Sequence, residues 1–165
     1  MLRFSIILAA GLLCLSSCAT PADAVDYCAN APEGDLCSYD ATRDAKSDVA
    51  AAQATARARG QKTIIAMGAN WCHDSRALAG HLDRPRFQTL INDNYQLVFV
   101  DVGQKNQNLD VARSFGLDAI VGTPTVIITD SDGEVLNLDT APTWRNAASR
   151  SEADIYNYFE RFATE

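Results

Sequence analysis

The order of apolar and polar runs predicts an α/β fold in three layers, with a central mixed β-sheet flanked by helices. Two β-rich runs, Lys62–Met67 and Tyr95–Val102, are each followed by a helix-compatible segment, and this alternation favours strands joined through helices. Later in the chain, two short apolar runs flank the turn Asp130–Gly133, whose Asp-Gly pair favours an antiparallel hairpin. A sheet that contains both kinds of strand pair is mixed.

The first predicted helix covers residues 40–59. Asp40 or Thr42 is its expected N-cap, and Gly60 ends it. The segment is rich in alanine, which favours a helix, but Val49 is its one large aliphatic residue. We therefore expect this helix to pack lightly against the rest of the domain.

The strand Lys62–Met67 leads to a candidate reactive residue. A turn of small residues follows the strand, and a helix-compatible run then extends from Ser75 to Leu82. Cys72 therefore lies at or near the first turn of a helix, where unpaired N–H groups and the helix dipole favour a thiolate over a thiol. A cysteine in that position is a candidate nucleophile.

The remaining elements follow from hydrophobic periodicity and from helix-breaking residues. Ser149 and Glu152 form a predicted capping box for the last helix. The other predicted elements are a helix at 86–92 after Pro85, a central strand at 95–102, a helix at 109–115, strands at 125–129 and 134–138, and a last helix to about Phe162 with Ile155, Tyr158, Phe159 and Phe162 on its apolar face.

Two motifs resemble those of thioredoxin-like proteins. The pentapeptide Trp71–Ser75 (Trp-Cys-His-Asp-Ser) resembles the family's Trp-Cys-x-x-Cys site, with serine in place of the second cysteine. About fifty residues later, Gly122–Thr125 (Gly-Thr-Pro-Thr) resembles the loop that carries the family's cis-proline. The resemblance extends from about Thr63 to Leu138. It implies a thioredoxin fold, with the Cys72 turn at the C-terminal edge of the sheet.

The resemblance implies a catalytic role for Cys72 and Ser75. Cys72 would attack a disulfide and form a mixed disulfide, but a serine hydroxyl is too weak a nucleophile to release it. Release would need an external thiol, a second cysteine of the substrate, or Cys28 or Cys37. Ser75 would instead donate a hydrogen bond that stabilises the Cys72 thiolate. This chemistry suits isomerisation, deglutathionylation or mixed-disulfide capture better than net reduction.

Other departures from the family pattern also argue against net reduction. Ala66 stands where thioredoxins carry a buried acid that assists the resolving cysteine. Thr123 replaces the common isoleucine and resembles the threonine of some disulfide isomerases. In the family, a cis peptide before the residue equivalent to Pro124 lets the backbone of the preceding residue pair with substrate. Trp71 is expected at the rim of the site, where it contacts substrate.

A second function remains open on the same residues. The chain is alternatively a redox-inactive thioredoxin-like lipoprotein that binds a protein partner through this face. A metal site is not expected, because Cys72, His73 and His81 fit no common zinc spacing. No cofactor is expected.

The first seventeen residues are predicted to be a lipoprotein signal peptide. Arg3 precedes a short apolar run, and residues 15–18 (Leu-Ser-Ser-Cys) resemble a bacterial lipobox, in which Cys18 becomes acylated. Ordinary signal cleavage near Ala19 or Ala22 is the alternative. Residues 18–39 would form a tether and residues 40–165 the thioredoxin-like domain. We expect a periplasmic location with a lipid anchor, and Ala19 favours the outer membrane by analogy.

The cysteine count supports one reactive thiol. If Cys14 leaves with the signal peptide and Cys18 is acylated, three cysteines remain. In an exported protein two of them should pair. Cys28 and Cys37 flank a turn-rich stretch and form the expected disulfide. The alternatives are that both stay free, or that one of them resolves Cys72.

The acidic balance of the chain excludes several classes of partner. The sequence has 14 basic and 21 acidic residues, a net charge of −7, and removal of residues 1–17 takes away Arg3, which leaves −8. An acidic surface without a basic run argues against nucleic acid and against anionic membranes. Membrane attachment would depend on the N-terminal lipid. The expected partners are protein thiols and disulfides, or a glutathione-type thiol.

Overall fold

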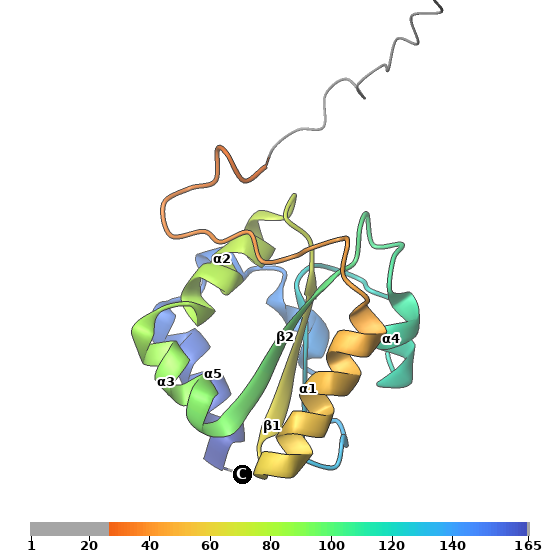
Figure 1. The fold of residues 1–165 in the computed structure, drawn as a ribbon. Helices are drawn as coiled ribbons and strands as arrows, with labels where there is room; N and C mark the ends of the chain where they lie inside the picture. Colours follow the sequence, from red (N-terminus) through yellow and green to blue (C-terminus); the bar gives the residue numbers. More distant parts are fainter. Residues whose placement is uncertain (1–26, 165) are drawn as a thin grey trace, which may run out of the picture.

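The sheet of the computed structural model, which describes residues 27–164, has three strands in the order β2-β1-β3 (Figure 1). The central strand β1 (Lys62–Gly68) pairs in parallel with β2 (Tyr95–Asp101) and antiparallel with β3 (Thr125–Thr129). The predicted α/β fold with a mixed sheet is therefore confirmed. No helix within the described range is long and apolar enough to cross a membrane.

Helices cover both faces of the sheet (Figure 1). On one face lie α1 (Ala45–Arg59) and the short α4 (Leu109–Ser114). The other face carries α2 (His73–Leu82), α3 (Pro85–Asn94) and α5 (Glu152–Thr164). Two short 3₁₀ helices, η1 (Ala141–Trp144) and η2 (Ala147–Ser149), connect β3 to α5.

Alternation along β1 divides the hydrophobic core between the two faces, because successive strand residues point to opposite sides. Ile64 is fully buried against the side of α2, α3 and α5. Ile65 and Met67 are fully buried on the side of α1 and α4. Trp144 is also fully buried, and its ring stacks on Phe159 of α5 at 5.3 Å between centroids.

The two predicted N-caps are wrong by a few residues. The carboxylate of Asp44, not of Asp40 or Thr42, accepts the hydrogen bond that caps α1, from Ser47 N–H. Asp40 is engaged instead in a local turn, since it accepts from the backbone and the hydroxyl of Thr42.

At α5 the capping role belongs to Ser151 and not to the predicted box of Ser149 and Glu152. Ser151 Oγ accepts from Asp154 N–H at 3.1 Å and donates to the Asp154 carboxylate at 2.7 Å. Ser149 lies in η2, where its hydroxyl donates to Asn146 O.

The predicted strand at 134–138 is also wrong, although its turn is present. Asp130 N–H donates to Glu134 O at 3.0 Å, and Thr129 and Val135 form an isolated bridge. Leu136 N–H still donates to Ile128 O at 2.8 Å, and the side chain of Asn137 then replaces a strand backbone. Its amide oxygen accepts from Ile128 N–H and its amide nitrogen donates to Val126 O, both at 2.8 Å.

We predict that Asn137→Ala destabilises the protein by about 2–4 kcal/mol, because two buried backbone groups of β3 lose their partners. Chemical denaturation with urea measures this change. The matched control is Asn92→Ala, at an exposed position of α3, which should change stability by less than about 0.5 kcal/mol. Equal stability of the two variants would contradict the assigned role of Asn137.

Candidate active site

Cys72 occupies the N-cap position of α2, directly after the turn that follows β1. Its backbone is extended (φ −87°, ψ 119°), and its carbonyl accepts the first hydrogen bond of the helix from Arg76 N–H at 3.1 Å. The thiol is free and half-buried. It therefore lies beside the unpaired N–H groups of the first helical turn, as the sequence predicted.

The two sequence motifs meet at the sulfur of Cys72. Its Sγ lies 3.3 Å from the carbonyl oxygen of Thr123 and donates a hydrogen bond to it. The peptide bond between Thr123 and Pro124 is cis, and both residues are buried. A backbone acceptor from the loop before β3 thus contacts the candidate nucleophile.

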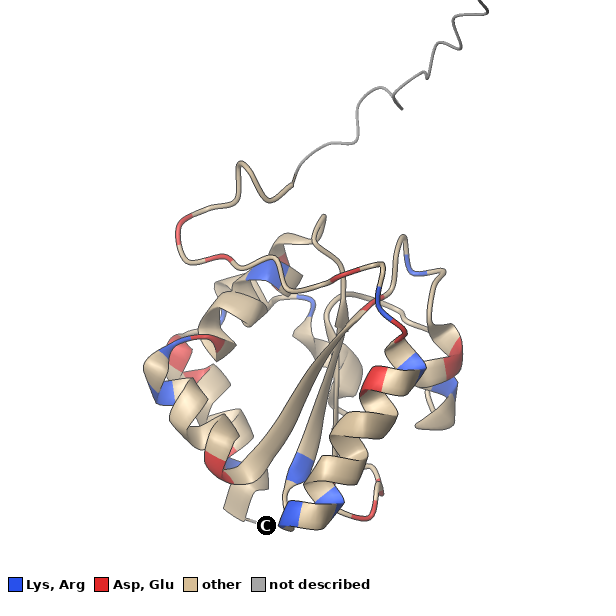
Figure 2. Ribbon diagram, in the orientation of Figure 1, with Lys and Arg blue, Asp and Glu red and all other residues tan. Residues whose placement is uncertain are grey.

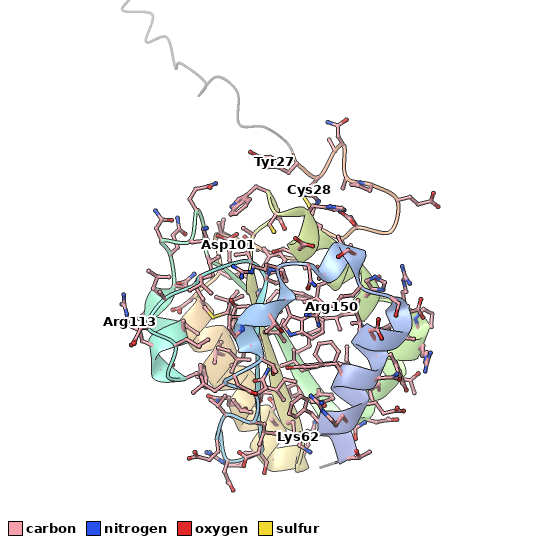
Figure 3. All side chains as sticks on the ribbon, turned by 180° about the vertical axis from the view of Figure 1, so that it is seen from behind. Tyr27, Cys28, Lys62, Asp101, Arg113 and Arg150 are labelled. Atoms are coloured by element: carbon pink, nitrogen blue, oxygen red, sulfur yellow. A yellow bond between two sulfur atoms is a disulfide. The ribbon has the colours of Figure 1, made fainter. Side chains whose placement is uncertain are left out.

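Trp71 is fixed at the rim of the site. Its indole Nε1–H donates to Gly103 O at 2.8 Å, and the side chain is half-buried. Asp101, at the end of β2, accepts from Gly103 N–H at 2.8 Å and so holds the loop that receives the indole. Figure 3 places Asp101 at one end of the molecule and Lys62, the first residue of β1, at the other.

Ser75 has a different partner from the one that the sequence suggested. The residue is fully buried, and its Oγ accepts from Ala69 N–H at 3.4 Å. The hydrogen bonds of residues 27–164 include none between Ser75 and Cys72. Ser75 Oγ instead faces Gly68, where an added Cβ would lie only 2.6 Å away.

Tyr39 is a residue of the site that the sequence did not indicate. It is 3% exposed, and its ring also lies against Gly68, with Cζ 2.6 Å from the position of an added Cβ. The side chain of Asn70 holds the Tyr39 backbone through hydrogen bonds of 3.1 and 2.8 Å. No sequence pattern marked this contact, because Tyr39 and Asn70 are 31 residues apart.

The hydroxyl of Tyr39 stays protonated at neutral pH. Burial raises the pKa of the hydroxyl far above its ordinary value, and nearby Ser75 offsets only part of that rise. Negative charge on Cys72 and on Asp101 raises the pKa further. The hydroxyl approaches Ser75 but makes no hydrogen bond of good geometry within the described residues. A neutral O–H group therefore lies beneath the site.

The segment before Tyr39, expected to be a tether, packs against α2 (Figure 1). Cys28 and Cys37 form a disulfide, with Cα atoms 6.0 Å apart. Leu36 N–H donates to Arg76 O at 3.0 Å. A Cβ on Gly80 would lie 1.7 Å from Gly34 O, so the chain approaches the helix as closely as glycine allows.

A buried ion pair accompanies this packing. Arg76 Nε lies 3.3 Å from Asp35 Oδ2, and the two side chains are 9% and 7% exposed. Arg76 also donates to Asn70 O at 2.7 Å. Because a buried charge without its partner is costly, the pair holds the disulfide-closed segment and the Cys72 turn together.

The two histidines have different surroundings. His73 is exposed, with Nε2 3.8 Å from Asp35 Oδ2. Burial lowers the pKa of His81, and the charge of Arg84 lowers it further. Within residues 27–164, no group of three or more His, Cys, Asp or Glu side chains is arranged to hold a metal ion. Cys18 and the predicted signal peptide lie outside the described residues.

Comparison with known proteins shows which family the chain resembles. The profile of the thioredoxin-like family matches residues 44–131, which include both Cys72 and Thr123. The chain belongs to the thioredoxin-like family. No curated protein matches the chain.

Two solved structures are similar to this thioredoxin-like chain. A disulphide isomerase from Xylella fastidiosa is 33% identical, with a TM-score of 0.72 over 79% of this chain and 98% of the other. A protein of unknown function from Pseudomonas aeruginosa is 15% identical, with a TM-score of 0.39 over 71% of this chain and 84% of the other.

We predict that Gly80→Ala releases the segment 34–37 from α2, since the new methyl group would overlap Gly34 O. Alanine favours the helix by about 1 kcal/mol, so α2 itself should persist. Hydrogen exchange at Leu36 N–H measures the release, with an expected loss of protection of at least about tenfold. Unchanged protection of that amide would contradict the close approach.

A second prediction concerns Ser75. Because no hydrogen bond joins its hydroxyl to Cys72 within residues 27–164, Ser75→Ala should leave the rate of Cys72 alkylation at pH 7 within about threefold. A hydrogen bond to the thiolate would contribute about 1.5–3 kcal/mol, and its loss would slow alkylation by tenfold or more. Iodoacetamide labelling followed by mass spectrometry distinguishes the two outcomes.

Proposed function

We propose that the chain carries out thiol–disulfide exchange through a single reactive cysteine, Cys72, in the bacterial envelope. The observation that carries the proposal is the position of the free Cys72 thiol at the N-cap of α2, 3.3 Å from the carbonyl oxygen of Thr123. A substrate sulfur that reaches Cys72 also meets the backbone of the Thr123 loop. The 33% identity to a crystallised disulphide isomerase supports the same chemistry.

The exchange proceeds in two balanced steps. The Cys72 thiolate attacks one sulfur of a substrate disulfide, a bond forms between the two sulfurs, and the other substrate sulfur leaves as a thiolate that takes a proton from water. A second thiol then attacks the mixed disulfide and restores Cys72. That thiol is another cysteine of the substrate or a small external thiol. In the first case the substrate disulfide is rearranged without net oxidation or reduction.

The surroundings of Cys72 favour rearrangement over net reduction. Ser75 has no thiol to resolve the mixed disulfide, and Ala66, in the position of the family's buried acid, is fully buried. The Cys28–Cys37 disulfide is already formed and lies against the same helix. Trp71 and the backbone at Thr123–Pro124 are the proposed substrate contacts.

We also propose that the protein is exported and lipid-anchored. A disulfide between Cys28 and Cys37 suits an oxidising compartment, and the lipobox-like sequence at Cys18 suits a bacterial lipoprotein. The proposed partners are proteins that carry thiols or disulfides, or a glutathione-type thiol.

A second candidate function is a redox-inactive module that binds a protein partner through the same face. Ser75 stands in place of the resolving cysteine, and Ala66 stands in place of the buried acid. Both replacements favour this second candidate. Under this candidate, replacement of Cys72 leaves partner binding unchanged.

The test is mixed-disulfide formation with a disulfide-bonded peptide. We use the full chain with Cys14→Ser and Cys18→Ser, so that Cys72 is the free thiol, and measure the adduct by mass spectrometry. We expect an adduct at Cys72 that persists until an external thiol is added, and at least a hundredfold less adduct in Cys72→Ser. An adduct of equal yield in Cys72→Ser, or none with either protein, would favour the binding module.

A further inference from the structure

An exposed arginine lies beside the loop that contacts Cys72. Arg145 is exposed and makes no hydrogen bond or ion pair with any residue of the described range. Its stem lies along Gly122, where an added Cβ would be 3.0 Å from Arg145 Cδ and 3.3 Å from Arg145 Cβ. Gly122 directly precedes Thr123, whose carbonyl oxygen accepts from Cys72 Sγ.

The segment that carries Arg145 is held in a fixed position. The preceding residue, Trp144, is fully buried and stacks on Phe159. Arg150 donates to Thr143 O at 2.8 Å and to Asn146 Oδ1 at 2.9 Å, which closes the segment on both sides of Arg145.

A contact with α2 ties the same segment to the reactive helix. Ala148 N–H donates to the carboxylate of Asp74 at 2.9 Å, and Asp74 is two residues after Cys72. Arg145 therefore extends from a segment that is held in place next to the site.

A surface hollow of about 500 Å³ lies on this side of the site. Val121, which is 60% exposed, gives it an apolar patch, and Arg145 gives it a positive charge. The remaining lining residues are Pro142, Thr143 and Asn146. The hollow thus offers one apolar and one cationic contact beside Gly122, the residue that precedes Thr123.

The positive charge of Arg145 contrasts with the acidic balance of the whole chain. The chain has a net charge of −7, and basic and acidic residues are interspersed on α1 and α3 (Figure 2). Several arginines are paired with acids, among them Arg43 with Asp48 and Arg84 with Glu152. The guanidinium of Arg145, which is unpaired within residues 27–164, is complementary to a carboxylate, which it can bind through two parallel hydrogen bonds.

We propose that Arg145 selects substrates with a carboxylate close to the reacting cysteine. The occupant of the hollow is an acidic, cysteine-containing peptide segment, with an apolar neighbour on Val121. This inference rests on the proposed function, because the peptide is held while its sulfur reacts with Cys72. Arg145 acts as a specificity residue, and the exchange step itself is unchanged.

The test compares two disulfide-bonded peptides that differ by Glu or Lys next to the cysteine. With the full chain carrying Cys14→Ser and Cys18→Ser, we expect the Glu peptide to form the Cys72 adduct about 3- to 10-fold faster in low salt. Arg145→Glu should reverse the preference, and Arg145→Lys should keep only part of it, because lysine retains the charge but not the two parallel hydrogen bonds. High salt should reduce the preference.

The matched control is Arg113→Glu, which changes the net charge by the same amount. Arg113 is an exposed residue of α4 and does not line the hollow. Figure 3 shows it on a different part of the molecule from Arg150, which holds the Arg145 segment. Wild-type preference in this variant supports a local effect of Arg145, whereas the same loss as in Arg145→Glu would overturn the inference.

The two proposals fail in different ways. Equal rates for the Glu and Lys peptides, with a normal Cys72 adduct, would overturn the role of Arg145 and leave the proposed function intact. A Cys72 that reacts with neither peptide would overturn both.

Discussion

The pairing of β1 with strands of opposite direction determines where the site forms. Gly68, the last residue of β1, pairs with Asp101 at the end of the parallel strand β2, while Met67 pairs with Thr125 at the start of the antiparallel strand β3. The chain therefore leaves β1 and enters β3 at the same edge of the sheet. Cys72 and Thr123, a few residues beyond these pairs, meet there although 51 residues separate them.

The residues under the site show how the N-terminal segment completes the fold. Gly68 leaves space that Ser75 Oγ and the Tyr39 ring fill together. The disulfide, the ion pair between Asp35 and Arg76, and the hydrogen bonds of Asn70 all hold this segment against α2 and the Cys72 turn. A side chain from outside the sheet thus fills space beneath the Cys72 turn.

Local patterns in the sequence predicted the three strands of the sheet and the position of Cys72, together with a strand at 134–138 that the structure does not form. The β-branched run before Cys72 and the helix-compatible run after it depend on neighbouring residues, so periodicity was sufficient. Asn137 was missed because a side chain can replace the hydrogen bonds of a strand without any periodic signal. Tyr39, Asp35 and Arg145 were missed because their roles depend on contacts with distant segments, which a single sequence does not display.

The direction from which the chain enters the domain affects access to the site. The described chain begins at Tyr27, at the same end of the molecule as Cys28 and Asp101, whereas its C-terminus lies at the opposite end (Figures 1 and 3). If the protein is anchored at Cys18, as we propose, the anchored end of the chain enters the domain on the side that carries Tyr27 and Asp101, which is also the side of the candidate site.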